Sequence, residues 1–459
     1  MQEVLPRRVH FIGIGGTGMS GLAKILLELG YQVTGSDLAS TAVTQRVETL
    51  GGTCYIGHRK ENIKDTGLVV ISSAINEDNP ELLEAGKKGV PVIHRADLLA
   101  WLMRRQKGLA VAGAHGKTTT SSMLAMALEN SGLDPTIVVG GELNDLGANA
   151  KLGSGEYLVA ESDESDGSFL KLDPLAVIVT NIEDDHLNYY GSIDSMKAAF
   201  STFLNKIPPE QGIAVVCLDD PYISEIIGNL KAPLVTYGFD SQADYTLRDV
   251  SLNGQSSGAA IYCQEEYVGW LELSVPGKHN LSNALAVVAL GRWLGLDFER
   301  ISNALRSFGG VGRRFEVIGE AKGIKIIDDY AHHPTEIAAT LKAARQVHGQ
   351  RLIAVFQPHR YTRTALLKER FGEAFGDADL VLISEIYGAG EKKLPGVTAG
   401  LIIEAVEKNT GKQVIYCPVL VDVVNYLMDV VQPGDLVMTL GAGDIYIAGI
   451  ELANRLKGN

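Results

Sequence analysis

The sequence predicts an α/β protein of three domains, each built on a largely parallel sheet. Strand-like apolar runs alternate with helical patterns along most of the chain, and two of these runs end in glycine-rich turns that open helices. The length of 459 residues exceeds what a single core usually supports. We therefore expect domains over residues 1–107, 108–312 and 313–459.

The first segment predicts a Rossmann-like domain. An apolar strand at Val9–Ile12 is followed by a glycine turn, an amphipathic helix and a second strand that ends near Gly35. Further strands are expected at 68–72 and 90–93. The basic stretch Met103–Gly108 is expected to be a linker.

The central segment predicts a parallel sheet of the P-loop type, because a helix follows the glycine turn at Gly116. Its strands are expected at 109–112, 157–160, 175–180 and 213–218. Between Asp244 and Val275, shorter alternating runs and an Asn253-Gly254 turn predict a small antiparallel addition. The third segment begins near Gly312 and again predicts a Rossmann-like domain. Its strands are expected at 325–328, 352–356, 380–383 and 436–440.

Composition and charge exclude several classes of protein. The net charge of -14 argues against a general nucleic-acid surface, which needs clustered Lys and Arg. No apolar run is long enough to span a bilayer, and the N-terminus lacks the pattern of a secretory signal, so we expect a cytoplasmic protein without a membrane partner. The four cysteines have no zinc or redox spacing and are expected to be buried thiols.

The first glycine turn, Gly13–Gly18, has the pattern G-x-G-x-x-G, and Asp37 follows the next strand. Such a turn lets the backbone approach a diphosphate, while the helix N-terminus supplies N–H groups and partial positive charge. The pattern specifies a diphosphate with a nearby sugar and fits a UDP-sugar as well as NAD. The predicted binding residues are Gly15, Gly16, Thr17, Gly18, Met19 and Asp37.

The second glycine turn resembles a contracted P-loop, because Val111 stands where the full pattern has glycine. Lys117 is expected to neutralise the β- and γ-phosphates of ATP, and the Thr118 hydroxyl to bind Mg²⁺. The predicted ATP-binding residues here are Gly113, Ala114, His115, Gly116, Lys117, Thr118 and Thr119.

Two further residues complete a predicted Mg²⁺ site. Glu161 stands at the end of one predicted strand and His186 follows another, and ligands gather at the carboxyl ends of parallel strands. With Thr118 they form an oxygen, oxygen and nitrogen donor set. The alternatives are a solvated acidic loop, which fits most of the carboxylates in "ESDESDGSF", and a histidine with a structural role.

Seven motifs in this order resemble the Mur ligases of peptidoglycan synthesis, over nearly the whole chain. They are "GAHGKTTT", "ESDESDGSFL", "TNIEDDHLNYYGS", "PGKHNLSNALA", "GVGRRFEVIG", "DDYAHHPTEI" and "FQPHRYTRT". Within the family, the chain is most similar to the branch that adds L-alanine. The resemblance implies a UDP-sugar domain, a central ATPase domain and a C-terminal amino-acid domain that closes over the site.

The resemblance also implies roles for residues outside the two glycine turns. His279 and Asn280 would contact ATP, Arg314 its terminal phosphate and Asp329 its ribose, while Arg360 and Arg363 would bind the alanine carboxylate. His332 would lie beside the reacting groups. We expect it to be the general base, because imidazole titrates near neutral pH, with phosphate orientation as the alternative role.

The implied reaction is the ATP-dependent joining of L-alanine to the lactyl carboxylate of UDP-N-acetylmuramate through an acyl phosphate, by a monomer or homodimer. Several sister ligases use a carbamylated lysine beyond the metal histidine. This chain has Lys197 and then Ser201 there, so no carbamate is assigned.

Other functions stay open at this point. An NAD-dependent oxidoreductase would explain the first turn but not Lys117, Glu161 and His186, and NADH titration would test it. A non-catalytic nucleotide-binding regulator would keep the glycine turns without the metal set. Within the family, a ligase that attaches a preformed tripeptide is the nearest alternative, and glycine or serine could replace L-alanine.

Overall fold

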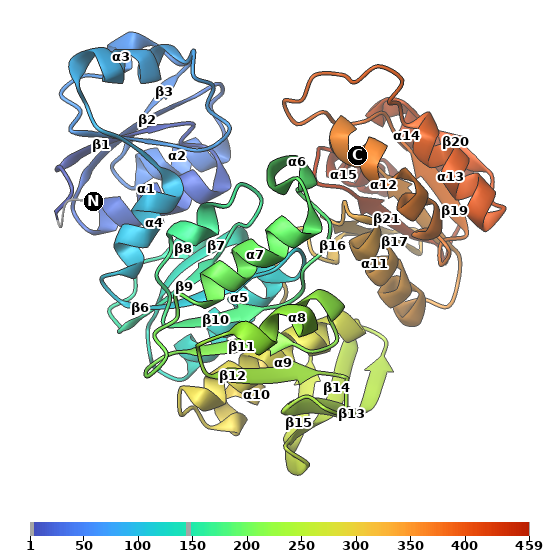
Figure 1. Cartoon of the computed structure of the whole chain (residues 1–459). Coiled ribbons are helices and arrows are strands. Elements are labelled where there is room, and N and C mark those ends of the chain that lie inside the picture. Colours follow the sequence, from blue (N-terminus) through green and yellow to red (C-terminus); the bar gives the residue numbers. More distant parts are fainter. Residues whose placement is uncertain (1–3, 144–147, 459) are drawn as a thin grey trace. The chain divides into compact units, whose positions relative to one another are not determined.

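The structure is a computed structural model that describes residues 4–143 and 148–458. Within these residues the strands form three sheets, with helices between most consecutive strands (Figure 1). The chain divides into two compact units. One comprises Met1–Arg248, Ile261–Gly269 and Ser282–Leu305, and the other comprises Asp249–Ala260, Trp270–Leu281 and Arg306–Asn459. The predicted α/β class with largely parallel sheets is confirmed.

The first sheet has the strand order β3-β2-β1-β4-β5, and all its pairs are parallel. Because the order reverses between β1 and β4, the loop after β1 borders the crevice in which such sheets bind ligands. The strands are β1 (Arg8–Ile12), β2 (Gln32–Asp37), β3 (Thr53–Ile56), β4 (Leu68–Ile71) and β5 (Val92–His94). The helices are α1 (Thr17–Glu28), α2 (Ala42–Thr49), η1 (Lys60–Asn62), α3 (Pro80–Lys88) and α4 (Arg95–Met103).

The second sheet has the order β15-β14-β13-β12-β11-β10-β6-β9-β7-β8. Since β6 lies between β10 and β9, with both pairs parallel, the loop after β6 lies beside the ends of both neighbours. The strands are β6 (Lys107–Ala112), β7 (Thr136–Leu143), β8 (Ala148–Lys151), β9 (Tyr157–Glu161), β10 (Ala176–Val179), β11 (Ile213–Cys217), β12 (Leu234–Gly238), β13 (Tyr245–Asn253), β14 (Ser256–Cys263) and β15 (Glu266–Leu273). The helices are α5 (Lys117–Asn130), η2 (Ser168–Lys171), α6 (Leu187–Tyr190), α7 (Ile193–Leu204), α8 (Pro221–Ile226), η3 (Ile227–Asn229), α9 (Lys278–Trp293) and α10 (Phe298–Arg306).

The expected antiparallel addition corresponds to β13, β14 and β15. Two-residue turns join them, at Gly254–Gln255 and Gln264–Glu265, and connections this short require antiparallel neighbours. Gly254, Gln264 and Glu265 all have positive φ, as such turns require.

The third sheet has the order β16-β17-β21-β18-β19-β20 and is parallel except for the β16–β17 pair. Fully buried apolar side chains cover both faces, including Leu352 and Phe356 on one and Ile353 and Val355 on the other. The strands are β16 (Glu316–Ala321), β17 (Ile324–Asp329), β18 (Leu352–Phe356), β19 (Leu380–Ile383), β20 (Val414–Tyr416) and β21 (Leu436–Leu440). The helices are α11 (Pro334–Val347), α12 (Tyr361–Glu373), α13 (Gly400–Thr410), α14 (Leu420–Val430) and α15 (Tyr446–Lys457).

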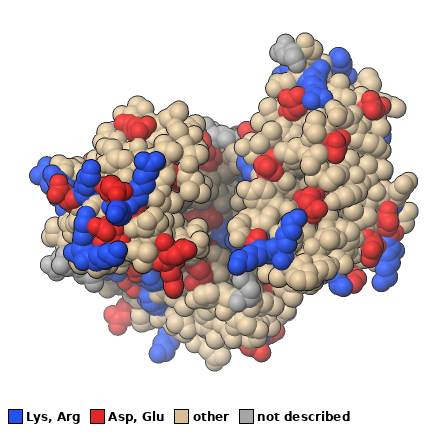
Figure 2. Space-filling view, turned by 90° about the horizontal axis from the view of Figure 1, so that it is seen from above, with Lys and Arg blue, Asp and Glu red and all other residues tan. Residues whose placement is uncertain are grey.

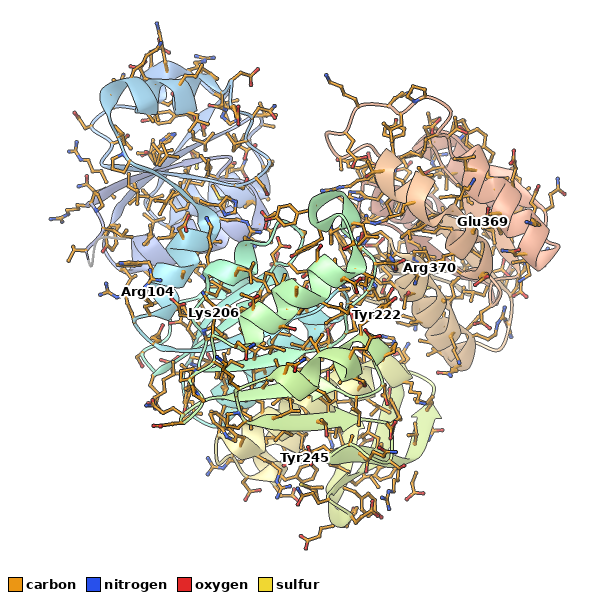
Figure 3. All side chains as sticks on the ribbon, in the orientation of Figure 1. Arg104, Lys206, Tyr222, Tyr245, Glu369 and Arg370 are labelled. Carbon is orange, nitrogen blue, oxygen red and sulfur yellow. The ribbon has the colours of Figure 1, made fainter. Side chains whose placement is uncertain are left out.

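The predicted linker at Met103–Gly108 is shorter than expected. Helix α4 ends at Met103 and β6 begins at Lys107, which leaves only three residues between them. Arg104 donates to Asp173 over 3.2 Å, and Lys206 donates to the same carboxylate over 3.0 Å (Figure 3). This stretch therefore connects α4 to β6, and its Arg104 also forms an ion pair within the first unit.

The expectation of four buried thiols is half right. All four cysteines are free, but only Cys217 and Cys417 are buried, whereas Cys54 and Cys263 are partly exposed. On the face shown in Figure 2, acidic and basic side chains lie beside one another. Across residues 4–143 and 148–458, no helix has the length and apolar character needed to cross a membrane.

Candidate active site

The second glycine turn is held against the end of β10 by Asn181. The N–H of Ala114 donates to the Asn181 carbonyl over 3.1 Å, and the N–H of His115 donates to the Asn181 side chain over 2.8 Å. Gly116 caps α5 with φ at 80°, a conformation that favours glycine. A Cβ there would also lie 2.7 Å from Asn283 Oδ1. The contracted loop is therefore a fixed structure that places Lys117 and Thr118 in the first turn of α5.

Lys117 is held by its own loop and by one buried carboxylate. Its Nζ lies 2.6 Å from the Gly113 carbonyl oxygen and 2.8 Å from Glu164 Oε2. Burial opposes the charge on Lys117, but Glu164 and Glu161 outweigh it and raise the pKa of the ammonium. Burial raises the pKa of Glu164 to about 7, although Lys117 acts in the opposite direction. Lys117 is therefore a positively charged side chain that is held against its own glycine turn.

Thr118 and Glu161 meet as the predicted metal site requires. Thr118 Oγ1 donates to Glu161 Oε2 over 2.9 Å, and the Gly140 N–H donates to the same oxygen over 2.6 Å. Both donors to a cation would be hard oxygens, which Mg²⁺ prefers. Thr119, the next residue of the turn, is partly exposed. The donor set of Thr118 and Glu161 fits Mg²⁺.

His186 contacts Glu164, which belongs to the acidic loop after β9. It has φ of 57° just before α6, and its Nε2 lies 3.5 Å from Asp185 Oδ2 and 3.9 Å from Glu164 Oε1. Tyr190 donates its hydroxyl to the Glu164 carbonyl over 2.5 Å. Glu164 therefore links Lys117 with His186. The sequence alone assigns Glu164 no role, since its neighbours are acidic too.

The first glycine turn is supported from β2. The N–H groups of Gly13 and Ile14 donate to the Ser36 carbonyl over 2.8 and 3.0 Å. The Gly15 N–H donates to Asp37 Oδ2 over 2.8 Å. Asp37 therefore binds the turn itself in this structure, and its predicted contact with a sugar stays a prediction.

The remaining residues of the first turn contribute mainly backbone. Gly16 is the N-cap of α1, and Thr17 and Gly18 begin the helix. Met19 is 2% exposed and its N–H donates to the Gly16 carbonyl over 3.0 Å, so its predicted contact with a ligand stays a prediction. A ligand at this turn would meet the helix N-terminus directly.

A buried polar network that the sequence did not predict lies beneath the first turn. Glu81 accepts from Ser36 Oγ over 2.5 Å, from Asn62 Nδ2 over 2.5 Å and from the Arg59 N–H over 3.2 Å. His10 Nε2 lies 3.5 Å away. Burial alone raises the pKa of Glu81, but the hydrogen bonds from His10, Ser36 and Asn62 outweigh it and lower the pKa to about 2. The Glu81 carboxylate thus holds Ser36 at the end of β2, and the Ser36 carbonyl in turn accepts from the N–H groups of the first turn.

In the second unit, Arg314 and Asp329 lie beside Glu336. Arg314 Nη1 lies 3.6 Å from Glu336 Oε1, and its guanidinium lies over the Tyr330 ring. Asp329 accepts from the N–H groups of Phe315 and Ala331, each over 2.8 Å. Burial raises the pKa of Asp329 to about 6, against the opposing effect of Arg314 and these N–H groups.

The structure does not support the titration argument for His332. Burial lowers the pKa of its imidazole well below the ordinary value, although Glu336 acts in the opposite direction. His332 Nδ1 lies 3.0 Å from the Tyr330 carbonyl oxygen and 3.3 Å from Glu336 Oε2. The shift arises because a free imidazole is fully hydrated, whereas this side chain is 19% exposed, and the role of His332 as the general base stays a prediction.

The other predicted residues of the second unit form two groups. His279 is exposed at the start of α9, and Asn280 is buried and donates to the Pro276 carbonyl over 2.7 Å. Arg363 is 7% exposed, with Nη1 3.3 Å from His359 Nδ1. Arg360 has φ of 71° at the N-cap of α12, and its Nε is buried without a hydrogen-bond partner among the described residues. A guanidinium with a buried and unused Nε donor suits a carboxylate ligand.

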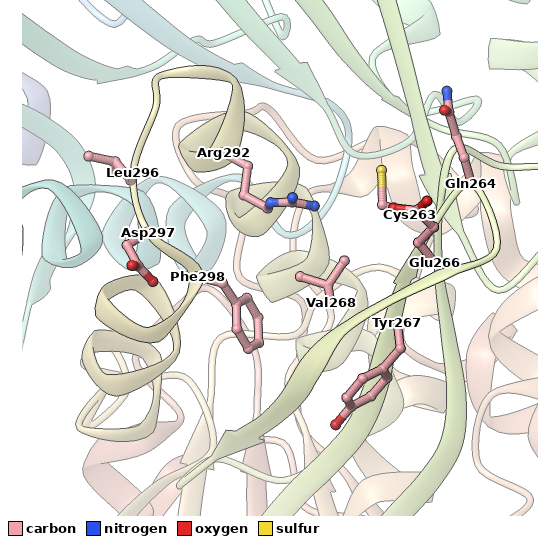
Figure 4. Close-up of a pocket in the computed structure, with 9 residues that line it drawn as sticks. All are labelled: Cys263, Gln264, Glu266, Tyr267, Val268, Arg292, Leu296, Asp297 and Phe298. Atoms are coloured by element: carbon pink, nitrogen blue, oxygen red, sulfur yellow. The ribbon is translucent and has the colours of Figure 1, made fainter.

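A pocket of about 470 Å³ lies elsewhere in the first unit (Figure 4). It lies between the β14–β15 turn and the junction of α9 and α10. Its lining residues are Cys263, Gln264, Glu266, Tyr267, Val268, Arg292, Leu296, Asp297 and Phe298. None of these is a predicted site residue.

Comparisons with known proteins define the class. Three family models match in order: "Mur ligase family, catalytic domain" at 8–107, "Mur ligase middle domain" at 111–291, and "Mur ligase, glutamate ligase domain" at 313–443. These are α/β domains with the two glycine turns in the first and second. The chain belongs to the Mur ligase family.

Its relatives within the family carry a particular name. A UDP-N-acetylmuramate–L-alanine ligase of Pelotomaculum thermopropionicum is 61% identical over 454 residues, 99% of this chain and 98% of the relative. One from Desulforamulus reducens is 54% identical and covers 98% of each chain. The crystal structure of the UDP-N-acetylmuramate-alanine ligase of Thermotoga maritima has a TM-score of 0.84 at 31% identity, over 98% of this chain and 99% of that one.

Proposed function

We propose that this chain is an ATP-dependent ligase that joins L-alanine to the lactyl carboxylate of UDP-N-acetylmuramate in peptidoglycan precursor synthesis. The observation that carries the proposal is 61% identity, over nearly the whole of both chains, to a relative with that name. The arrangement of Lys117, Thr118 and Glu161 supports a phosphate-activating reaction. The domain boundaries 1–107, 108–312 and 313–459, a cytoplasmic location and a monomeric or homodimeric state are part of the proposal.

The two glycine turns divide the substrates between them. The turn at Gly113–Thr119 binds the phosphates of ATP, with Lys117 released from Glu164 to meet the β- and γ-phosphates. The turn at Gly15–Met19 binds the diphosphate of the sugar nucleotide at the N-terminus of α1, and Asp37 lies near its uridine. Thr118, Glu161 and His186 would hold Mg²⁺, which would supply positive charge to the phosphates.

The reaction proceeds in two steps. A lactyl carboxylate oxygen attacks the γ-phosphorus and the β–γ bond breaks, which gives an acyl phosphate and ADP. The alanine amine, having lost a proton, then attacks the acyl carbon, and phosphate leaves as the acyl C–O bond breaks. Lys117 and Arg314 offset the negative charge, and positioning brings together anions that would otherwise repel.

Residues of the central and C-terminal segments supply the remaining contacts. His279, Asn280 and Asp329 contact ATP, while Arg360 and Arg363 bind the carboxylate of L-alanine as paired guanidinium groups. His332 lies beside the reacting groups. Because burial holds its pKa well below the ordinary value, the ring is neutral at pH 7 and suits accepting a hydrogen bond better than taking up a proton.

A phosphate-release assay tests the proposal. The purified chain is incubated with ATP, Mg²⁺ and UDP-N-acetylmuramate, and with L-alanine, glycine, L-serine or the stem tripeptide. Release that needs both the sugar nucleotide and L-alanine is expected. Phosphate release with the tripeptide but not with L-alanine would contradict the proposed specificity. Phosphate release that does not depend on the sugar nucleotide would contradict the proposed reaction.

NADH titration, followed by nicotinamide fluorescence, tests the rival reading of the first turn. No saturable binding is expected, because the proposed ligand of that turn is a sugar nucleotide. Saturable binding at micromolar NADH would favour an oxidoreductase.

A further inference from the structure

We propose that Arg95 is a substrate-binding residue for the diphosphate of the sugar nucleotide, held in place by Asp163. This inference rests on the proposed function, because it assigns a residue to the ligand of the first glycine turn. Arg95 is the first residue of α4 and directly follows β5, so it lies at the carboxyl edge of the first sheet, as the turn does.

The guanidinium of Arg95 lies against the first turn. A Cβ added to Gly18 would be 3.4 Å from Arg95 Nη1 and 3.9 Å from its Cζ. Gly18 is the last glycine of the G-x-G-x-x-G pattern and belongs to the first turn of α1. These are van der Waals distances, so the cation lies directly beside the N-terminal turn of α1, where an anionic ligand is expected.

The other edge of the same guanidinium is fixed. Arg95 Nη2 donates to Asp163 Oδ2 over 2.5 Å, and the arginine side chain is only 22% exposed. Asp163 Oδ1 accepts from the Ser165 N–H over 3.0 Å, so the carboxylate is itself held. A planar guanidinium oriented through one edge keeps its remaining donors pointed at a fixed place, which lowers the entropic cost of binding an anion.

This arrangement also ties the two glycine turns together. Asp163 lies between Glu161, which contacts Thr118, and Glu164, which contacts Lys117. The Arg95–Asp163 pair thus connects the diphosphate turn to the acidic loop of the ATP site. Arg95 is therefore positioned to bind one substrate while its partner belongs to the loop that serves the other.

A nearby ion pair provides a matched control. Lys171 Nζ lies 2.8 Å from Asp97 Oδ2, and this pair joins the same helix, α4, to the same segment after β9. Asp97 is two residues beyond Arg95, and neither partner belongs to the proposed site. Lys171→Gln therefore removes an ion pair of α4 without removing the cation beside Gly18.

Calorimetric titration with UDP and with uridine tests the inference. For Arg95→Gln we expect UDP affinity to fall at least tenfold and uridine affinity to stay within twofold, because only UDP carries the diphosphate. Arg95→Lys keeps the positive charge but lacks the paired donors of the guanidinium, so UDP affinity should fall by about threefold to fivefold. Lys171→Gln should stay within twofold for both ligands. In steady-state assays, Arg95→Gln should raise the KM for UDP-N-acetylmuramate and leave the KM for ATP within twofold.

Several outcomes overturn the inference. Equal UDP affinity in Arg95→Gln and the unaltered chain excludes a diphosphate contact, and an equal loss in Lys171→Gln assigns the effect to the attachment of α4. If Arg95→Gln does not fold, unchanged UDP affinity in Arg95→Lys decides against the inference. An unaltered chain that does not bind UDP overturns the proposed substrate as well, whereas UDP binding that Arg95→Gln preserves overturns the inference alone.

Discussion

The two glycine turns of this chain have the same local shape and different chemistry. Each follows a buried parallel strand and opens a helix, at Thr17 in one and at Lys117 in the other. The first is held by main-chain bonds to Ser36 and by Asp37. The second carries an ammonium and a hydroxyl, which contact the carboxylates of Glu164 and Glu161 respectively. The shape alone supports diphosphate binding, and the added charged groups support transfer of a phosphoryl group.

The difference also appears in where charge is buried. Beneath the first turn, the charge of Glu81 is shielded from ligands by the strand end that it fixes. In the second turn, Lys117 is 15% exposed and has a carboxylate partner that a phosphate can replace. One buried charge thus supports the fold, and the other is available to a ligand.

The largest predicted effect is at the second turn. Lys117→Ala should lower the rate of ADP formation by about a thousandfold or more, because it removes the cation that offsets charge on the transferred phosphate. UDP affinity should be unchanged, since the first turn is intact. Coupled-enzyme detection of ADP together with UDP calorimetry checks both. If Lys117→Ala turned over at nearly the rate of the unaltered chain, the second turn could not be assigned the phosphoryl-transfer chemistry that distinguishes it from the first.

The next largest effect concerns the metal ligands. Glu161→Gln should lower kcat by roughly a hundredfold and raise the Mg²⁺ concentration needed for half-maximal rate, because an amide oxygen carries no charge for the cation. Gln keeps an acceptor for Thr118 and for the Gly140 N–H. A Mg²⁺ titration of the rate measures the shift. A lower kcat with an unshifted Mg²⁺ curve would assign Glu161 to the loop structure instead.

A smaller effect is predicted for Glu81, in the buried polar network beneath the first turn. Glu81→Gln should cost about 2–3 kcal/mol of unfolding free energy at pH 7, because the folded pKa of about 2 lies below the ordinary value of 4.5. A lowered carboxyl pKa stabilises the fold above about pH 4.5, and this stability is lost as the pH falls towards 2. The difference between the two chains in urea unfolding should therefore shrink between pH 5 and pH 3. A difference that does not change with pH would mean that packing, and not charge, is lost.

The sequence predicted the turns well because their requirements are local. A strand, a glycine at Gly116 and a lysine beside it are contiguous, and so is the relation of Gly13–Gly18 to the helix that follows. The position of Glu161 was predictable too, because the end of a parallel strand has a known relation to its neighbour. Among the described residues, six strands were not predicted, namely β3, β7, β8, β12, β16 and β20. Four of them, β3, β8, β16 and β20, lie at sheet edges, where one-sided pairing leaves a weaker apolar pattern.

What the sequence could not predict depends on contacts between distant residues. Glu81 meets Ser36 across 45 positions and Arg95 meets Asp163 across 68. Each looks like an ordinary surface charge within its own helix pattern. The lowered pKa of His332 has the same origin, because desolvation depends on the packing of the folded chain.

The smallest effect is predicted at Lys197, to which no carbamate is assigned from the sequence. Its ammonium lies 2.8 Å from Asp194 and 2.6 Å from Glu225, and the hydrogen bonds that it donates to these carboxylates raise its pKa. Carbamate formation needs the neutral amine, which this pairing disfavours. Lys197→Gln should therefore change kcat by less than threefold, and removing bicarbonate from the buffer should have no effect on either chain. A large loss of activity that short-chain carboxylic acids restore would show that a carbamate completes the second turn's metal site, and that its charge is not supplied by Lys117, Thr118 and Glu161 alone.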